Sequence, residues 1–323
     1  MAVLAFPAGA GRAGVALATA TLYNIFRARR VEREHPPAGR FVEFDGIRLH
    51  YLEKGDGPPV VLLHGNVVTV EDWVLSGMLH RLAERGHRAI AFDRPGYGYS
   101  DRPRGSAWTA VDQADLLRRA LARPGDCGRP LLGQQRRTGA RPRRLGGGAR
   151  AGPALGLLPP DPARRRAAGR THGGAGVGRS AAPHRLAAAL LPLLVKGMFS
   201  PLPVPERFAA GFPYGMAVRL SQIRAEAQDG AGMAAGVAAT REHYRELGMP
   251  VAIVAGTKDR VVDMGRPAAR LQGKIPVSEL QLVPGAGHMV HYAMPGLVAE
   301  LVGAVSARSA GTPRPTRFAA AVD

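Results

Sequence analysis

The sequence predicts an α/β protein with a doubly wound, mostly parallel sheet and a helical lid. Three observations predict it. Short apolar runs alternate with helical patterns in both halves of the chain, these runs end in glycine-containing turns, and a longer helical stretch separates the halves. Strands that alternate with helices build parallel sheets covered on both faces. At 323 residues the chain can hold one such domain with a lid.

The N-terminal residues 3–26 are mostly apolar, and three arginines follow at once between residues 27 and 30. About 20 apolar residues can span a bilayer, and basic residues after a span keep the next domain on the cytoplasmic side. We therefore expect a membrane anchor within residues 1–30 and a membrane-associated protein. A signal peptide cleaved near Ala18-Thr19-Ala20, or an ordinary first helix of a cytoplasmic protein, are the alternatives.

The first half of the core is expected at residues 41–126. Residues 41–44 and 47–52 have strand patterns and are joined by Asp45-Gly46, which predicts a β-hairpin. The following pattern predicts a strand over 60–63, a helix over 71–85, a strand over 89–92 and a helix over 110–122 with Leu116, Leu117, Ala120 and Leu121 inward. The apolar run at 60–63 suits a strand buried on both faces.

The second half of the core is expected at residues 248–307. Strands are predicted over 251–255 and 279–283, with helices near 267–271 and 295–305. Residues 186–247 predict a lid of two or three helices, and residues 308–323 predict a disordered tail. The lid residues Phe199, Phe208, Phe212 and Tyr214 suit either an apolar substrate group or the core of the lid itself.

Three strand ends carry residues suited to catalysis, because catalytic groups of a parallel sheet gather at the carboxyl ends of its strands. His64-Gly65-Asn66 offers a tight turn with backbone N–H groups. The turn over 256–262 offers the carboxylate of Asp259, and the glycine-rich turn over 284–289 offers the imidazole of His288.

These pieces, with the loop Asp93-Arg94-Pro95-Gly96-Tyr97-Gly98, resemble in their order the α/β-hydrolase fold family, in its serine esterase and lipase branch. The resemblance covers about residues 41–307 apart from the middle. It implies Asp259 as the acid of a catalytic triad, His288 as its general base, and backbone N–H groups at Gly65 and Asn66 as the oxyanion hole. It also implies an enzyme that hydrolyses a small-molecule ester without a metal or organic cofactor.

Other residues could take these roles. Asp263 could replace Asp259, which could instead be an ordinary turn residue or helix cap. His291 is a weaker alternative to His288, which could itself be a surface histidine. We expect His64 to brace its loop, and Asn66 could be structural.

The nucleophile that the family requires is missing. A Gly-x-Ser-x-Gly elbow should stand near residues 131–137, where the sequence places Gln135 in the nucleophile position. Ser180 lies in a relaxed match, Gly178-Arg179-Ser180-Ala181-Ala182, but no strand precedes it. Cys127, the only cysteine, lies in a turn-like run that suits no catalytic role.

The segment 127–185 is abnormal in composition. Arg, Gly, Ala and Pro supply 43 of its 59 residues, and 13 arginines against one aspartate give it +12 of the net charge of +19. Such a segment cannot build a sheet core, and we expect it to be disordered. It also lacks the interleaved aromatic residues of a nucleic-acid site, so we expect no nucleic-acid partner, although a polyanion site stays an alternative.

A frameshift would explain both the missing nucleophile and the abnormal composition of residues 127–185. If Gln134-Gln135-Arg136-Arg137 is encoded CAG CAG CGG CGG, reading one base later gives Ser-Ser-Gly-Gly. Loss of two bases after the Gly133 codon would then convert an elbow Gly-His-Ser-Ser-Gly into the present sequence, with the frame restored between about residues 185 and 194. The chain as written is then expected to be inactive. A genuine arginine-rich insert is the alternative.

Two other functions stay open. A dehalogenase-like or epoxide-hydrolase-like enzyme is compatible with His64-Gly65-Asn66, but it needs an aspartate nucleophile. The other is a non-catalytic binding protein with the same fold. In an enzyme a nucleophile would reach His288, whereas in a binding protein none would. The oligomeric state is not predicted.

Overall fold

The computed structural model describes residues 8–106, 108–122, 154–155, 182–262 and 265–310. Its strands are β1 (Arg40–Phe44), β2 (Ile47–Lys54), β3 (Pro59–Leu63), β4 (Arg88–Phe92), β5 (Ala154–Leu155), β6 (Val251–Gly256) and β7 (Ser278–Val283). One sheet has the order β1-β2-β4-β3-β5 and the other pairs β6 with β7. β3 runs parallel to β4 and β5, and β6 runs parallel to β7, whereas β2 pairs antiparallel with both β1 and β4. The predicted α/β class is confirmed.

The hairpin of β1 and β2 forms at the predicted turn. Asp45 and Gly46 have φ values of 51° and 72°, and Phe44 pairs with Ile47 across them. Positive φ at both central residues is the backbone of a type I′ turn, whose twist matches that of the flanking strands. Asp-Gly is favoured there because both residue types tolerate this region.

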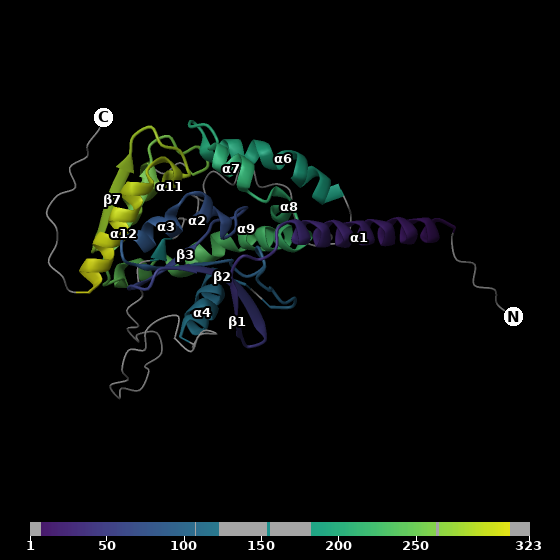
Figure 1. The fold of residues 1–323 in the computed structure, drawn as a ribbon, viewed down its shortest axis with the longest axis horizontal. Coiled ribbons are helices and arrows are strands. Elements are labelled where there is room, and N and C mark those ends of the chain that lie inside the picture. Colours follow the sequence, from purple (N-terminus) through teal and green to yellow (C-terminus); the bar gives the residue numbers. More distant parts are fainter. Residues whose placement is uncertain (1–7, 107, 123–153, 156–181, 263–264, 311–323) are drawn as a thin grey trace.

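The strands β3 and β4 are buried on both faces, as their apolar runs predict. Val60, Leu62, Ala89 and Ala91 pack on one face, against α2 (Glu71–Leu75), α3 (Met78–Glu84) and α12 (Pro295–Ser309). Val61, Ile90 and Phe92 pack on the other face against α4 (Ala110–Leu121), whose predicted inward residues Leu116, Leu117, Ala120 and Leu121 are all buried. Figure 1 shows α3 and α12 on one side of the sheet and α4 on the other.

One predicted helix is two helices. The pattern over 71–85 predicts a single helix, but α2 ends at Leu75 and α3 begins at Met78. Gly77 between them has a φ of 76°, in the left-handed region. A left-handed residue cannot continue a right-handed helix, so the chain changes direction there.

The lid contains more helices than predicted. It consists of α6 (Ala182–Phe199), α7 (Glu206–Gly211), α8 (Tyr214–Ala217), α9 (Leu220–Thr240) and a short 3₁₀ turn (His243–Glu246). The predicted lid aromatics pack on one another: ring centroids of Phe208 lie 5.0 Å from Phe199 and 4.7 Å from Phe212, which lies 5.2 Å from Tyr214. Of the two readings of these residues, the lid core is the one that the packing supports.

The second half of the core is completed by α10 (Gly265–Gln272), α11 (Val290–Ala293) and α12, which continues to Ser309 and so two residues beyond residue 307, where the core was predicted to end. Of the abnormal segment 127–185, the structure describes only the short strand β5 and the start of α6. The predictions for Cys127, Gln135 and Ser180, and for the part 311–323 of the predicted tail 308–323, lie outside the described residues.

The first helix, α1 (Ala8–Glu34), extends away from the body toward the N-terminus (Figure 1). Within the described residues, no helix combines the length and the hydropathy needed for a membrane span. The C-terminal half of α1 is held by the lid, since Arg219 Nη1 at the start of α9 lies 2.6 Å from Glu32 Oε1.

Candidate active site

Asp259 and His288 meet at the ends of β6 and β7. The imidazole Nδ1 of His288 lies 2.8 Å from Asp259 Oδ2, and both side chains are largely buried. The other oxygen of the carboxylate, Oδ1, accepts the backbone N–H groups of Val261 and Val262, each at 2.9 Å. Asp259 therefore caps its own turn with one oxygen and faces the histidine with the other.

The parallel pairing of β6 and β7 brings these two turns together. Gly256 pairs with Val283 at the strand ends, and the Lys258 N–H donates to Ala286 O at 2.9 Å. A Cβ on Gly256 would lie 2.3 Å from the carbonyl oxygens of Ala286 and Gly287. Such a distance is too short for any side chain, so glycine at 256 is what allows the His288 turn to lie against the turn of Asp259.

His64 braces the loop that follows β3. Its Nε2 accepts the Arg94 backbone N–H at 3.0 Å, so its Nδ1 carries the proton and donates to Gly65 O at 2.7 Å. Burial lowers the pKa of His64 to about 4, which keeps the ring neutral at pH 7. With both nitrogens engaged, His64 has no free nitrogen for proton transfer.

The side chain of Asn66 is held by the loop after β4. Its Oδ1 accepts Arg94 Nη2 at 2.7 Å and the Tyr97 hydroxyl at 3.0 Å. Val68, two residues after Asn66, is buried in the same apolar cluster as Met289, which directly follows His288. The loop after β3 and the turn that carries His288 therefore each place a residue in the same cluster.

The loop after β4 is itself fixed by Asp93. This buried carboxylate accepts His50 Nδ1 at 2.7 Å, the Tyr99 N–H at 3.0 Å and the Val70 N–H at 3.0 Å. Burial alone would raise the pKa of Asp93, yet the bond from His50 and the neighbouring histidines hold it below its ordinary value. Its contact with Val70 ties this loop to the end of the loop that begins at His64.

Helix α9 of the lid makes ion pairs and hydrogen bonds with the loop after β4. Asp229 on α9 lies 2.9 Å from Arg102 Nη1 and 3.1 Å from Arg94 Nη2, and it also accepts the Tyr97 hydroxyl and Gln113 Nε2. The side chains of Arg102 and Asp229 are 1% and 7% exposed. Sequence reasoning missed Asp229, because no local pattern marks an acid that meets its partners more than a hundred residues away.

A second contact of α9 holds the residue after Asn66. Val67 has a φ of 76°, which is unfavourable for a β-branched residue, and its carbonyl accepts Gln222 Nε2 at 3.0 Å. Glu226, one turn further along α9, lies beside the Val67 N–H. Burial raises the pKa of Glu226 to about 7, although hydrogen bonds from Gln222 and Val67 oppose the rise.

Of the alternative site residues, the structure describes only His291, which pairs with a different carboxylate from His288. His291 Nε2 lies 3.0 Å from Asp72 Oδ2 in a buried pair between α11 and α2. Asp263, Gln135 and Ser180 lie outside the described residues. In the part of the chain that the structure describes, no three His, Cys, Asp or Glu side chains gather closely enough to hold a metal ion.

A protein-family model and several known proteins match parts of this chain. The model of the alpha/beta hydrolase family matches residues 60–301. The chain is 34% identical over 92 residues to the mesoderm-specific transcript protein of Mus musculus, 27% of either chain. It is 42% identical over 59 residues to a haloalkane dehalogenase of Mycolicibacterium paratuberculosis, 18% of this chain and 19% of the relative. The matches thus span about a quarter or less of these relatives.

Solved structures match over more of the chain. An alpha/beta hydrolase fold protein from Burkholderia ambifaria aligns with a TM-score of 0.56 at 22% identity, over 81% of this chain and 96% of that one. An esterase from Exiguobacterium antarcticum aligns with a TM-score of 0.53 at 19% identity, over 83% and 99%. At these identities the likeness concerns the fold alone.

Proposed function

The chain belongs to the alpha/beta hydrolase family, and we propose that it is a hydrolase of small ester-type substrates with a Ser-His-Asp mechanism whose nucleophile is missing from this sequence. The contact of 2.8 Å between His288 Nδ1 and Asp259 Oδ2 carries the proposal. An acid and a base at the ends of adjacent parallel strands, late in the chain, are what such a mechanism requires.

In this mechanism His288 is the general base. The carboxylate of Asp259 holds the ring proton on Nδ1, so the lone pair on Nε2 takes the proton of a serine hydroxyl as that oxygen attacks the ester carbonyl. Asp259 also stabilises the resulting imidazolium. The imidazolium then gives its proton to the leaving alcohol, and water releases the acyl group by the reverse sequence of proton transfers.

The oxyanion hole of this mechanism belongs to the loop after β3. We assign it to the backbone N–H groups at Gly65 and Asn66, which would donate to the carbonyl oxygen as it gains negative charge. The support is indirect: the side chain of Asn66 is already held by Arg94 and Tyr97, which leaves its backbone as the part available to a substrate.

We attribute the missing nucleophile to a frameshift near Gly133. The family match runs from residue 60 to residue 301, on both sides of the abnormal segment. A change of frame that is later restored has this effect, since it spares the sequence before and after it. The nucleotide sequence of the gene tests this directly: a reading frame that encodes Ser at position 135 in related strains supports the proposal, and an identical frame in all of them opposes it.

The second candidate function is a dehalogenase-like or epoxide-hydrolase-like reaction. It is favoured by the match to a haloalkane dehalogenase. Such enzymes need an aspartate nucleophile, whereas the re-read elbow supplies serine, so we place this function second. A non-catalytic binding protein is the third, and it would bind substrate analogues without turnover.

Hydrolysis of p-nitrophenyl acetate and butyrate tests the function. A chain with the frame restored should turn over, whereas the chain as written should show only the residual catalysis of binding and oxyanion contacts, roughly 10³- to 10⁴-fold over water. His288→Ala should abolish turnover of the restored chain. His80→Ala is the matched control, because this histidine is exposed on α3 and should leave turnover unchanged. Equal turnover in both chains would contradict the proposal.

A further inference from the structure

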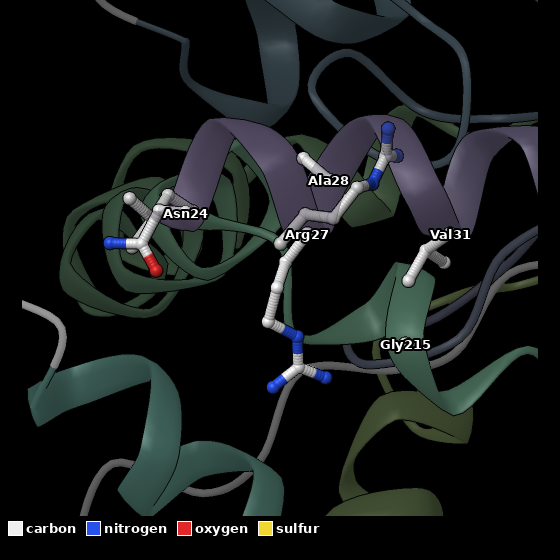
Figure 2. A pocket seen from close by; sticks show the side chains of 7 residues that line it. Asn24, Arg27, Ala28, Val31 and Gly215 are labelled. Atoms are coloured by element: carbon white, nitrogen blue, oxygen red, sulfur yellow. The ribbon is translucent and has the colours of Figure 1, made fainter. Parts of the chain in front are cut away.

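Helix α1 and the lid enclose a small pocket beside the start of α9. Its lining includes Asn24, Arg27 and Val31 of α1 and Gly215, Arg219 and Leu220 of the lid. Figure 2 shows the amide of Asn24 and the guanidinium of Arg27 on the same side of α1 as Val31. The two walls are in contact, since a Cβ on Gly215 would lie 2.8 Å from Val31 Cγ2.

The side chain of Asn24 lines this pocket without a hydrogen-bond partner. Asn24 is 8% exposed, and both its amide oxygen Oδ1 and its amide nitrogen Nδ2 are buried and unpaired. Buried amide groups are nearly always hydrogen-bonded, because leaving them unpaired forfeits their hydration with nothing in return. A donor and an acceptor left unpaired in the wall of a pocket indicate that a polar group binds there.

Arg27 gives the pocket a positive charge that the protein does not balance. The two glutamates near it on α1 are already paired, since Glu32 Oε1 lies 2.6 Å from Arg219 Nη1 and Glu34 Oε1 lies 2.7 Å from Arg30 Nε. Among the described residues, no carboxylate forms an ion pair with Arg27. The half-buried guanidinium of Arg27 is therefore available to an anion.

Helix α9 begins at this pocket with uncapped N–H groups. No side chain caps its start at Arg219, although the helix runs for 21 residues. Its first helical bond is from Ile223 N to Arg219 O, at 2.9 Å, and the N–H groups of Leu220 and Ser221 precede it. In the described part of the chain these two donate to no backbone carbonyl. Free N–H groups and the positive end of the helix dipole favour an anion at such a place.

We propose that this pocket binds the phosphate group of inorganic phosphate or of a phosphate monoester. Arg27 supplies the charge, while Asn24 Nδ2 and the N–H group of Leu220 donate to phosphate oxygens. Asn24 Oδ1 needs a donor, which the hydroxyl of a singly protonated phosphate provides and an ionised carboxylate does not. The site does not depend on the proposed reaction, because none of these residues belongs to the candidate active site.

NMR titration of the isotope-labelled full chain as written tests the proposal. Inorganic phosphate is added at constant ionic strength and at about pH 6, where phosphate still carries a hydroxyl. The amide resonances of Leu220 and Ser221 should shift and saturate. Arg27→Gln should weaken the affinity at least about tenfold, because it removes a charged hydrogen-bond donor. Asn24→Leu should weaken it at least about fivefold, because it removes a neutral one.

Thermal unfolding separates binding from folding in the same variant. Without phosphate, Asn24→Leu should keep or raise the Tm, because it removes two buried polar atoms that have no partner. Phosphate should raise the Tm of the wild type by mass action and should leave that of Asn24→Leu nearly unchanged.

Arg29→Gln is the matched control. Arg29 is exposed on the same helix and lies about 200° around it from Arg27, so its loss removes the same charge outside the pocket. The affinity should not change, which matters in a chain of net charge +19 that attracts phosphate elsewhere.

Dihexanoyl phosphatidic acid distinguishes the two sources of the phosphate. Binding at least about tenfold tighter than that of inorganic phosphate, and weakened by Arg27→Gln, assigns the pocket to a lipid headgroup, whereas equal affinity assigns it to free phosphate. Two results would overturn the proposal. The resonances of Leu220 and Ser221 could fail to shift, which would leave the pocket to water, or Arg27→Gln and Arg29→Gln could bind phosphate equally well.

Discussion

His288 Nδ1 lies 2.8 Å from Asp259 Oδ2, while the backbone of the Asp259 turn holds the other carboxylate oxygen. The two N–H groups fix the orientation of the carboxylate independently of its contact with the imidazole. In the proposed mechanism, this pair needs no rearrangement when His288 gains a proton. This arrangement survives in a chain whose expected nucleophile position holds glutamine.

The buried ion pair between Asp229 of α9 and Arg102 of the loop after β4 should contribute strongly to the free energy of unfolding. Asp229→Asn leaves Arg102 buried without a carboxylate, and removing one partner of a buried ion pair costs about 3 kcal/mol of unfolding free energy. Urea denaturation measures this loss. Asp115→Asn is the control, because Asp115 and its arginine partners on α4 are exposed and should contribute less than about 1 kcal/mol. Equal losses of unfolding free energy in the two variants would show that the buried ion pair of Asp229 does not stabilise the fold more than a surface pair.

Glu226 should make the protein less stable as the pH rises. Its pKa is about 7 in the folded chain against 4.5 for an unperturbed glutamate, so the folded state binds this proton more tightly. Its contribution is fully present below about pH 4.5 and is lost as the pH rises through 7. Glu226→Gln should therefore remove a fall of about 1 to 3 kcal/mol in unfolding free energy over this range.

Denaturant titrations of the wild type and the variant at several pH values check this prediction. Glu242→Gln is the control, since Glu242 is exposed and should leave the pH dependence as it is. A Glu226→Gln variant with the same pH dependence as the wild type would show that Glu226 titrates normally.

Gly256 should tolerate no side chain. Gly256→Ala places a Cβ 2.3 Å from two carbonyl oxygens of the His288 turn, and the backbone shift that relieves this contact should cost about 1 to 3 kcal/mol. Gly303→Ala within α12 meets only the edge of His87 at 3.9 Å and should be neutral or stabilise by up to about 1 kcal/mol. Thermal unfolding distinguishes them, and a neutral Gly256→Ala would mean that the two turns are not in close contact.

The sequence predicted features that depend on local pattern. The Asp45-Gly46 turn, the doubly buried strands β3 and β4, and the inward face of α4 follow from residues a few positions apart. The candidate pair Asp259 and His288 was named from strand-end turns and a family resemblance. The close contact between their two turns, which a side chain at Gly256 would prevent, depends on tertiary packing and not on local pattern.

Long-range contacts were beyond prediction from the sequence. Asp229 meets Tyr97 and Arg102 only because the lid folds back over the sheet. The break at Gly77 was missed because an isolated glycine within a helical pattern does not by itself show a left-handed backbone. The helices of the lid were undercounted because α7 and α8 are too short to show a period.

The most direct test of the account is fluorophosphonate labelling of two matched chains, the sequence as written and a chain with the frame restored after Gly133. We predict that the restored chain is labelled, that His288→Ala sharply reduces this label, and that the chain as written is not labelled, because it has no serine for His288 to activate. Labelling of the chain as written that disappears on Ser180→Ala would contradict the account, since it would make the arginine-rich segment a genuine part of the catalytic site.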